Sequence, residues 1–178
     1  MLHIITGGSG SGKSVYAEDK ILALSGQASK AKRIYIATMY PVDEESHQRI
    51  EKHRRMRENK NFETIECFTN LKQLEVPNDS YVLLECMSNL AANEMYLDFG
   101  AKEDTVKAVL EGIDLLLRNV KELVIVTNEI FSDSGIYFEA TKYYLSCLGN
   151  INQELSRKAE NVVEVVYGIP VILKGGSL

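Results

Sequence analysis

The sequence predicts a single α/β domain whose central sheet is mostly parallel. Short apolar segments alternate with helical patterns along the chain, and a glycine-rich loop joins the first apolar segment to the first helix. The length of 178 residues and a composition that is 45% hydrophobic and 25% charged are those of an ordinary globular domain. We therefore expect one domain that spans residues 1–178.

The strands are predicted from short runs of apolar, β-branched and aromatic residues. In a parallel sheet covered on both faces such runs are nearly continuous, because both sides of each strand are buried. Five runs fit, the last of them weakly: Leu2–Thr6, Arg33–Thr38, Tyr81–Cys86, Leu123–Thr127 and Phe62–Cys67. Val162–Tyr167 and Val171–Leu173 predict a hairpin at the sheet edge that turns through Gly168, Ile169 and Pro170, since proline suits a turn or a strand start.

Helical patterns occupy the intervals between these strands. The polar segment that follows Pro41 and Asp43 predicts a long, charged helix, and a short helix is expected near Leu71. The predicted helices are Val15–Leu24, Glu44 to about Asn59, Asn89–Asp98, Val106–Val120, Phe138–Leu148 and Ile151–Ala159.

Charge and cysteine content exclude several classes of protein. The 20 basic and 25 acidic side chains give a net charge of −5, which disfavours a nucleic-acid partner. Cys67, Cys86 and Cys147 form no C-x-x-C pair, so neither a disulfide framework nor a structural metal site is indicated. The apolar run Met1–Ile5 is too short for a signal peptide or a membrane span. We expect a cytoplasmic protein without a membrane or nucleic-acid partner.

The segment GGSGSGKS matches the phosphate-binding pattern G-x-x-x-x-G-K-S, between a predicted strand and a predicted helix. Glycines let backbone N–H groups curl around a phosphate at the positive end of a helix. Lys13 is expected to reach the β- and γ-phosphate oxygens, and Ser14 to bind Mg²⁺. The residues predicted to contact the nucleotide here are Gly7, Gly8, Ser9, Gly10, Ser11, Gly12, Lys13 and Ser14.

A second acidic motif should follow another strand, because ligands gather at the carboxyl ends of parallel strands. No apolar strand ends in aspartate: YVLLEC carries Glu85, and LVIVTNE carries Glu129. Glu85 is the better candidate for the metal or nucleotide edge, although the sequence does not decide between the two carboxylates.

The charged helix holds an arrangement suited to group transfer. Arg49, His53 and Arg57 are four residues apart, so they share one helix face and place two guanidinium groups beside an imidazole. A histidine there is a candidate nucleophile, and the arginines are candidate phosphate ligands. His3 is expected to be a strand residue and His47 a surface residue.

Taken together, TGGSGSGKS, YIAT, RIEKHRRMR, ETIE, LLEC and VTNE resemble, in that order, the bifunctional adenosylcobinamide kinase / adenosylcobinamide-phosphate guanylyltransferases of cobalamin biosynthesis. The resemblance covers residues 1–130 and returns at Asn152–Gln153. It implies a RecA-like P-loop domain, often assembled as a homotrimer, that uses ATP or GTP with Mg²⁺. Such an enzyme phosphorylates the aminopropanol hydroxyl of adenosylcobinamide and then transfers GMP from GTP to that phosphate, which gives adenosylcobinamide-GDP.

The resemblance also assigns residues. His53 matches the histidine that becomes guanylylated, and Lys13 and Ser14 match the residues that hold the phosphates and Mg²⁺. The positions matching those associated with nucleotide contacts are Thr38, Arg54, Arg57, Glu66 and Glu85.

The chain departs from the family pattern at three places. Asn150 replaces an arginine, residues 131–137 lack a proline, and Phe62 stands where the family often has tryptophan. Two alternatives therefore stay open: a diverged kinase or nucleotidyltransferase with another acceptor, and a regulatory module that binds GTP without turnover.

Overall fold

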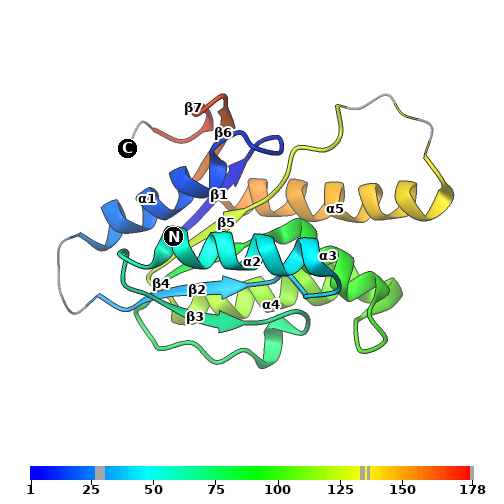
Figure 1. Ribbon diagram of the computed structural model, residues 1–178, viewed down its shortest axis with the longest axis horizontal. Coiled ribbons are helices and arrows are strands. Elements are labelled where there is room, and N and C mark those ends of the chain that lie inside the picture. Colours follow the sequence, from blue (N-terminus) through cyan, green and yellow to red (C-terminus); the bar gives the residue numbers. More distant parts are fainter. Residues whose placement is uncertain (27–30, 133–134, 136, 177–178) are drawn as a thin grey trace.

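The computed structural model describes residues 1–26, 31–132, 135 and 137–176, and one twisted sheet forms its centre (Figure 1). Within these residues the sheet has seven strands in the order β3-β2-β4-β5-β1-β6-β7. Every neighbouring pair is parallel except β6 and β7, which confirms the predicted parallel sheet with an antiparallel hairpin at its edge. The strands are β1 (Leu2–Thr6), β2 (Arg33–Ala37), β3 (Phe62–Glu66), β4 (Tyr81–Glu85), β5 (Glu122–Val126), β6 (Asn161–Val166) and β7 (Ile169–Lys174).

Helices cover both faces of the sheet, so each face has its own apolar core. Helix α1 (Lys13–Ser25) packs on one face, where Ile5, Ile21 and Val124 are fully buried. On the other face lie α3 (Met87–Tyr96), α4 (Thr105–Asn119) and α5 (Glu139–Lys158), which bury a larger cluster. Because the central strands are buried on both sides, they are nearly continuous apolar runs, as predicted.

Helix α2 (Glu44–Arg57) is held differently from the other helices. Asp43 caps its first turn: the Asp43 carboxylate accepts a hydrogen bond from the Ser46 backbone N–H at 2.7 Å, and the Ser46 hydroxyl accepts one from the Asp43 N–H at 3.0 Å. Only Ser46 and Arg57 of this helix are buried, with Ile50 and His53 half-buried on the same face. The capping box, the acidic residues of the first turn and the basic residues of the last turn therefore stabilise α2 more than core packing does.

Two predicted details at the C-terminal end are wrong. The two helices expected at Phe138–Leu148 and Ile151–Ala159 form the single helix α5, because the buried stripe of Leu148, Ile151 and Leu155 continues past Gly149. The hairpin turns through only two residues.

That hairpin turn consists of Tyr167 and Gly168, both with positive φ, of 51° and 79°. Two-residue hairpins favour this conformation because its twist matches that of the strands. Ile169 and Pro170 therefore belong to β7, where Pro170 pairs with Val165 near the strand start.

The carboxyl ends of the parallel strands lie at one edge of the sheet, here called the carboxyl edge. In Figure 1, α3 and the first half of α5 extend beyond this edge. Short 3₁₀ turns at Leu71–Gln73 and Lys102–Asp104 join neighbouring elements, the first where a short helix was predicted. Among the described helices, none is both long and apolar enough to span a bilayer.

Candidate active site

The loop between β1 and α1 has the conformation of a phosphate cradle. Gly7, Gly10 and Gly12 have φ values of 154°, 72° and 92°, which disfavour residues with a side chain. A Cβ atom added to Gly7 would lie 2.5 Å from the carbonyl oxygen of Val165. Glycine is therefore required at this position both by the backbone conformation and by the neighbouring strand.

The polar groups of this loop suit a polyphosphate. The Lys13 ammonium donates a hydrogen bond to the Gly8 carbonyl oxygen at 2.9 Å, which holds it over the loop. The Ser11 hydroxyl is buried without a hydrogen-bond partner, while the Ser11 carbonyl accepts from Gly168 N–H at 2.8 Å. A phosphate at the positive amino end of α1 would satisfy that hydroxyl and receive the free backbone N–H groups.

Burial lowers the pKa of Lys13, and the nearby Cys86 thiol and Glu85 carboxylate oppose that change. A desolvated ammonium interacts more strongly with an anion than an exposed one does, because the local dielectric constant is lower. The position of Lys13 therefore favours interaction with phosphate oxygens.

Glu85, at the carboxyl end of β4, contacts residues from three other elements of the site. Its Oε1 atom accepts a hydrogen bond from the Ser14 hydroxyl, and its Oε2 atom accepts one from the Tyr35 hydroxyl at 3.2 Å. His53 Nδ1 lies 3.8 Å from Oε1. The carboxylate is 9% exposed, so this corner joins the phosphate loop to α2 with little contact with water.

Tyr35 is a site residue that the sequence interpretation missed. Burial, reinforced by the adjacent Glu85 carboxylate, raises the pKa of Tyr35 well above its usual range, so the hydroxyl stays protonated and donates to Glu85. In the sequence, Tyr35 is one more aromatic residue in the strand RIYIA. Only the parallel register, which pairs Ala37 with Glu85, places the two side chains on the same face.

The basic residues of α2 have different surroundings. Arg49 pairs with Glu45 at 2.6 Å, while the Arg57 guanidinium stacks 3.4 Å above the centre of the Tyr35 ring. His53 therefore has a carboxylate, Glu85, as its nearest ionic partner, and the two arginines on its helix face are engaged elsewhere.

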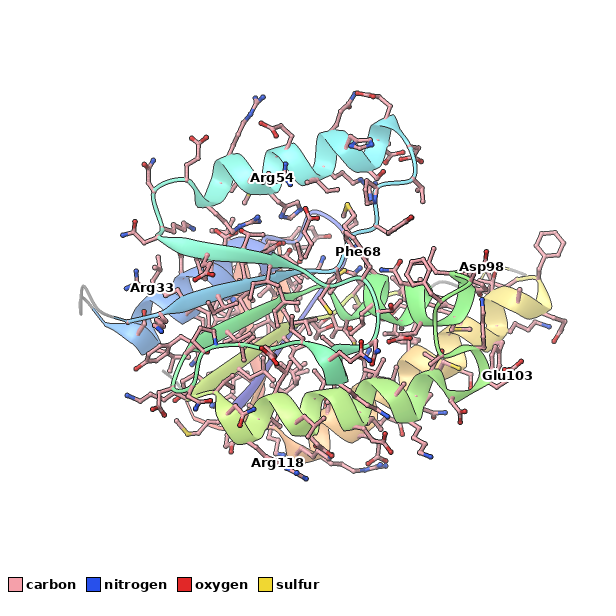
Figure 2. All side chains as sticks on the ribbon, turned by 90° about the horizontal axis from the view of Figure 1, so that it is seen from below. Arg33, Arg54, Phe68, Asp98, Glu103 and Arg118 are labelled. Carbon is pink, nitrogen blue, oxygen red and sulfur yellow. The ribbon has the colours of Figure 1, made fainter. Side chains whose placement is uncertain are left out.

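Arg54 and Glu66 form an exposed ion pair, with Arg54 Nη2 at 3.0 Å from Glu66 Oε1. Figure 2 shows Arg54 on α2, and the stacking of Arg57 on Tyr35 holds this helix against β2. This pair joins α2 to the end of β3, and both side chains are accessible to solvent.

Thr38 is fully buried and does not face the phosphate loop directly. Its hydroxyl accepts a hydrogen bond from Cys86 N–H at 2.7 Å and donates one to the Cys86 carbonyl at 2.8 Å, which ties the ends of β2 and β4 together.

Glu129, the other carboxylate considered for a metal, accepts hydrogen bonds from Phe131 N–H and the Ser132 hydroxyl, both at 3.0 Å. Of the two carboxylates, Glu85 is the one that contacts Ser14.

A divalent cation fits this corner only together with phosphate. The Ser14 hydroxyl and Glu85 carboxylate are adjacent oxygen donors, which suit Mg²⁺, an ion that takes few protein ligands and completes its shell with phosphate oxygens and water. No group of three or more His, Cys, Asp or Glu side chains suited to a metal occurs in the part of the chain that the structure describes.

Comparison with known proteins identifies close relatives in sequence. A family model described as "Cobinamide kinase / cobinamide phosphate guanyltransferase" matches residues 3–173. The chain is 33% identical to the bifunctional adenosylcobalamin biosynthesis protein CobU of Escherichia coli, over 98% of this chain and 100% of the relative. It is 28% identical to the bifunctional adenosylcobalamin biosynthesis protein CobP of Pseudomonas aeruginosa, over 100% of both chains.

Two solved structures share the fold at low sequence identity. A KaiC-like protein of Pyrococcus horikoshii has a TM-score of 0.50 and 13% identity, with 92% of this chain and 69% of that chain covered. The flagellar accessory protein FlaH of Methanocaldococcus jannaschii also has a TM-score of 0.50 and 13% identity, with 98% and 78% covered. These likenesses confirm the expected RecA-like α/β architecture and concern the fold alone.

Proposed function

Because the chain belongs to the cobinamide kinase / cobinamide phosphate guanyltransferase family, we propose that His53 carries a guanylyl group from GTP to cobinamide phosphate. The family makes the protein a bifunctional transferase of adenosylcobalamin biosynthesis, and both activities use a nucleotide substrate. One observation carries the assignment of His53: of the three histidines, it is the one that lies beside Glu85, the carboxylate bound to the phosphate loop.

In the kinase reaction, the aminopropanol hydroxyl of adenosylcobinamide attacks the γ-phosphorus of ATP or GTP. A new P–O bond forms, the bond to the β,γ-bridging oxygen breaks, and the hydroxyl proton is lost to solvent. Lys13 and the loop N–H groups stabilise the charge that develops on the phosphate oxygens, which is the main catalytic contribution in phosphoryl transfer. Mg²⁺ held by Ser14 and Glu85 would neutralise further negative charge on the β- and γ-phosphates.

In the guanylyl reaction, His53 Nε2 attacks the α-phosphorus of GTP, a P–N bond forms and pyrophosphate leaves. His53 Nδ1 is buried without a hydrogen-bond partner and lies 3.8 Å from Glu85, so a small movement would let it donate to the carboxylate and leave the lone pair of Nε2 available. The positive charge that the ring gains in this step is stabilised by the same carboxylate. A phosphate oxygen of adenosylcobinamide phosphate then attacks the phosphorus, the P–N bond breaks, and neutral histidine is regenerated.

Two of the remaining residues are proposed to hold the nucleotide and two to support Glu85. Arg54 and Glu66 are both exposed, and Arg54 suits a phosphate while Glu66 suits the N–H donors of a guanine edge. Thr38 acts through the backbone, because it fixes the end of β4 that carries Glu85. Arg57 supports Tyr35, and through it Glu85, by stacking on the ring.

We also propose that the chain assembles as a homotrimer, as the family resemblance suggests. Support comes from β7, an edge strand whose apolar side chains remain exposed: Ile169, Val171, Ile172 and Leu173. An exposed apolar edge strand is a liability in an isolated protein and is normally covered. A second copy of the chain would cover it.

Intact-protein mass spectrometry after incubation with GTP and Mg²⁺ tests the covalent route. Wild-type protein should gain an acid-labile mass equal to one guanylyl group, and His53→Ala should gain none while still binding nucleotide. His47→Ala is the matched control, because His47 is an exposed histidine of the same helix. An adduct that persists in His53→Ala, or that is lost only in His47→Ala, would contradict the proposal.

A further inference from the structure

Exposed aromatic side chains concentrate beyond the carboxyl edge of the sheet. Among the described residues, six aromatic side chains are exposed, and all but Tyr167 lie on α3, on α5 or in the segments next to them: Tyr96, Phe99, Phe131, Phe138 and Tyr143. In Figure 1 this part of the molecule extends past the strands as a helical platform. Exposed aromatic surface of this extent on a soluble domain indicates a binding surface.

Part of this surface is preorganised by contacts between rings. Tyr40, which follows β2, packs edge-on against Phe68 and Phe99, with ring centroids 5.1 and 6.2 Å apart. Phe99 is nevertheless 61% exposed. The Tyr96 hydroxyl donates a hydrogen bond to the Ala140 carbonyl of α5 at 3.1 Å, which fixes a second exposed ring. We call Tyr40, Phe68, Tyr96 and Phe99 the aromatic shelf.

The aromatic shelf is joined to the nucleotide site by a continuous set of hydrogen bonds. The Asn93 side-chain amide donates to the Thr38 carbonyl at 2.7 Å and to the Phe68 carbonyl at 2.9 Å. Thr38 in turn holds the backbone of Cys86, the residue that follows Glu85. Figure 2 shows Phe68 just past the end of β3, between α2 and the part of the platform marked by Asp98. A molecule on the shelf therefore lies at the same edge as the phosphate loop.

We propose that the aromatic shelf binds the corrin macrocycle of cobinamide and so positions its aminopropanol arm toward the phosphate loop. This inference rests on the proposed function, since it locates the acceptor of the same two reactions. A corrin ring carries methyl groups as well as amide side chains around its periphery, and exposed aromatic rings offer contact area to those apolar groups. A guanine base is smaller and requires hydrogen-bonding partners, which Arg54 and Glu66 offer near the end of β3.

The test compares the corrinoid and nucleotide dependence of variants in the shelf. Phe99→Ala and Tyr96→Ala remove exposed rings, and Leu115→Ala removes an exposed apolar side chain of α4 as the matched control. Binding of adenosylcobinamide is measured by equilibrium dialysis through its visible absorbance, and guanylylation of His53 is measured separately with GTP alone. We expect each shelf variant to weaken corrinoid binding by about tenfold, while guanylylation and the melting temperature match those of Leu115→Ala.

Unchanged corrinoid affinity in both variants and in the double variant would overturn the proposal. A higher GTP concentration for half-maximal guanylylation, with unchanged corrinoid binding, would also overturn the proposal, because the shelf would then be a nucleobase site. Phe99→Trp, which retains a ring, should restore most of the affinity, whereas a structural defect would not be rescued in this way. Because dialysis needs no guanylyl transfer, failure of the shelf is distinguishable from failure of His53 as the nucleophile.

Discussion

Glu85 accepts a hydrogen bond from the hydroxyl of Ser14, so the carboxyl end of β4 is joined directly to the first turn of α1. The same carboxylate oxygen lies 3.8 Å from the ring of His53. One acidic side chain therefore faces both the phosphate loop, which we propose as the site of the kinase reaction, and the histidine proposed for guanylyl transfer. The two activities are expected to depend on it together.

We predict that Glu85→Gln lowers both activities by about 100-fold or more, because the amide keeps the shape of the side chain but removes its charge. Kinase activity is followed by ATP-dependent phosphorylation of adenosylcobinamide, and guanylylation by mass spectrometry with GTP. Glu129→Gln is the control, since Glu129 accepts hydrogen bonds only from its own loop in the described structure. Equal losses in the two variants would contradict a special role for Glu85.

We predict that Tyr35→Phe lowers the free energy of unfolding by about 1 kcal/mol, because it removes one hydrogen bond to a buried carboxylate. The ring contacts with Phe62 and Arg57 are retained, so the change isolates the hydroxyl. Urea unfolding measures the change in stability. If Tyr35 acts by positioning Glu85, its effect on the guanylylation rate should vanish in the Glu85→Gln background, and additive effects would contradict that role.

The sequence predicted most of the fold because its signals are local. Each central strand is a continuous apolar run, and the loop from Gly7 to Ser14 has a spacing that only a phosphate cradle requires. The predicted break in α5 falls at Gly149 and Asn150, where the structure continues the helix. Helix propensity disfavours glycine by only about 1 kcal/mol, which the buried stripe on either side outweighs.

The site was less predictable than the fold, because it depends on which strands become neighbours. His53, Ser14 and Glu85 could be named from motifs, but their mutual contact follows from the order β2-β4-β5-β1, which no local pattern contains. The surroundings of Arg57 illustrate the same limit. Spacing placed it beside His53, whereas the tertiary structure buries it over Tyr35.

We predict that Gly7→Ala destabilises the protein by about 1–3 kcal/mol and weakens nucleotide binding. The residue has φ of 154°, and the new Cβ would lie 2.5 Å from the Val165 carbonyl and 2.6 Å from the Ser11 hydroxyl. Gly8→Ala is a matched control in the same loop, because a Cβ there meets nothing within 4 Å. Thermal unfolding and GTP titration check the prediction, and equal effects at the two positions would refute this account of the loop.

We predict that Ile172→Lys converts the assembled protein to a monomer without changing its secondary structure. Ile172 is 45% exposed on β7, so a lysine is tolerated in the isolated chain but is costly in an apolar interface. Light scattering coupled to size-exclusion chromatography gives the mass. Leu115→Lys is the control on α4, and an unchanged trimer in Ile172→Lys would place the interface elsewhere.

His3 lies buried in β1, at the amino end of the sheet, and is expected to make the protein sensitive to acid. Its Nε2 atom donates a hydrogen bond to Glu122 at 2.9 Å, and Nδ1 accepts one from the Asn161 amide at 3.0 Å, an arrangement that suits the neutral ring. Burial lowers the pKa of His3 below its ordinary value of 6.5, with Lys20 and the terminal ammonium of Met1 acting in the same direction against Glu122.

Because the folded state binds the His3 proton less readily than the unfolded chain, His3 contributes stability that is fully present above pH 6.5. That contribution is lost as the pH falls from 6.5 through the lowered pKa of the folded state. We expect the free energy of unfolding, measured in urea, to fall over this window in the wild type and to fall less in His3→Gln, whose amide does not titrate. His47→Gln, on the surface of α2, should follow the wild-type curve. A His3→Gln curve as steep as the wild type would assign the acid sensitivity to other groups, of which Glu160, held by the Leu2 N–H, is the nearest carboxylate with a lowered pKa.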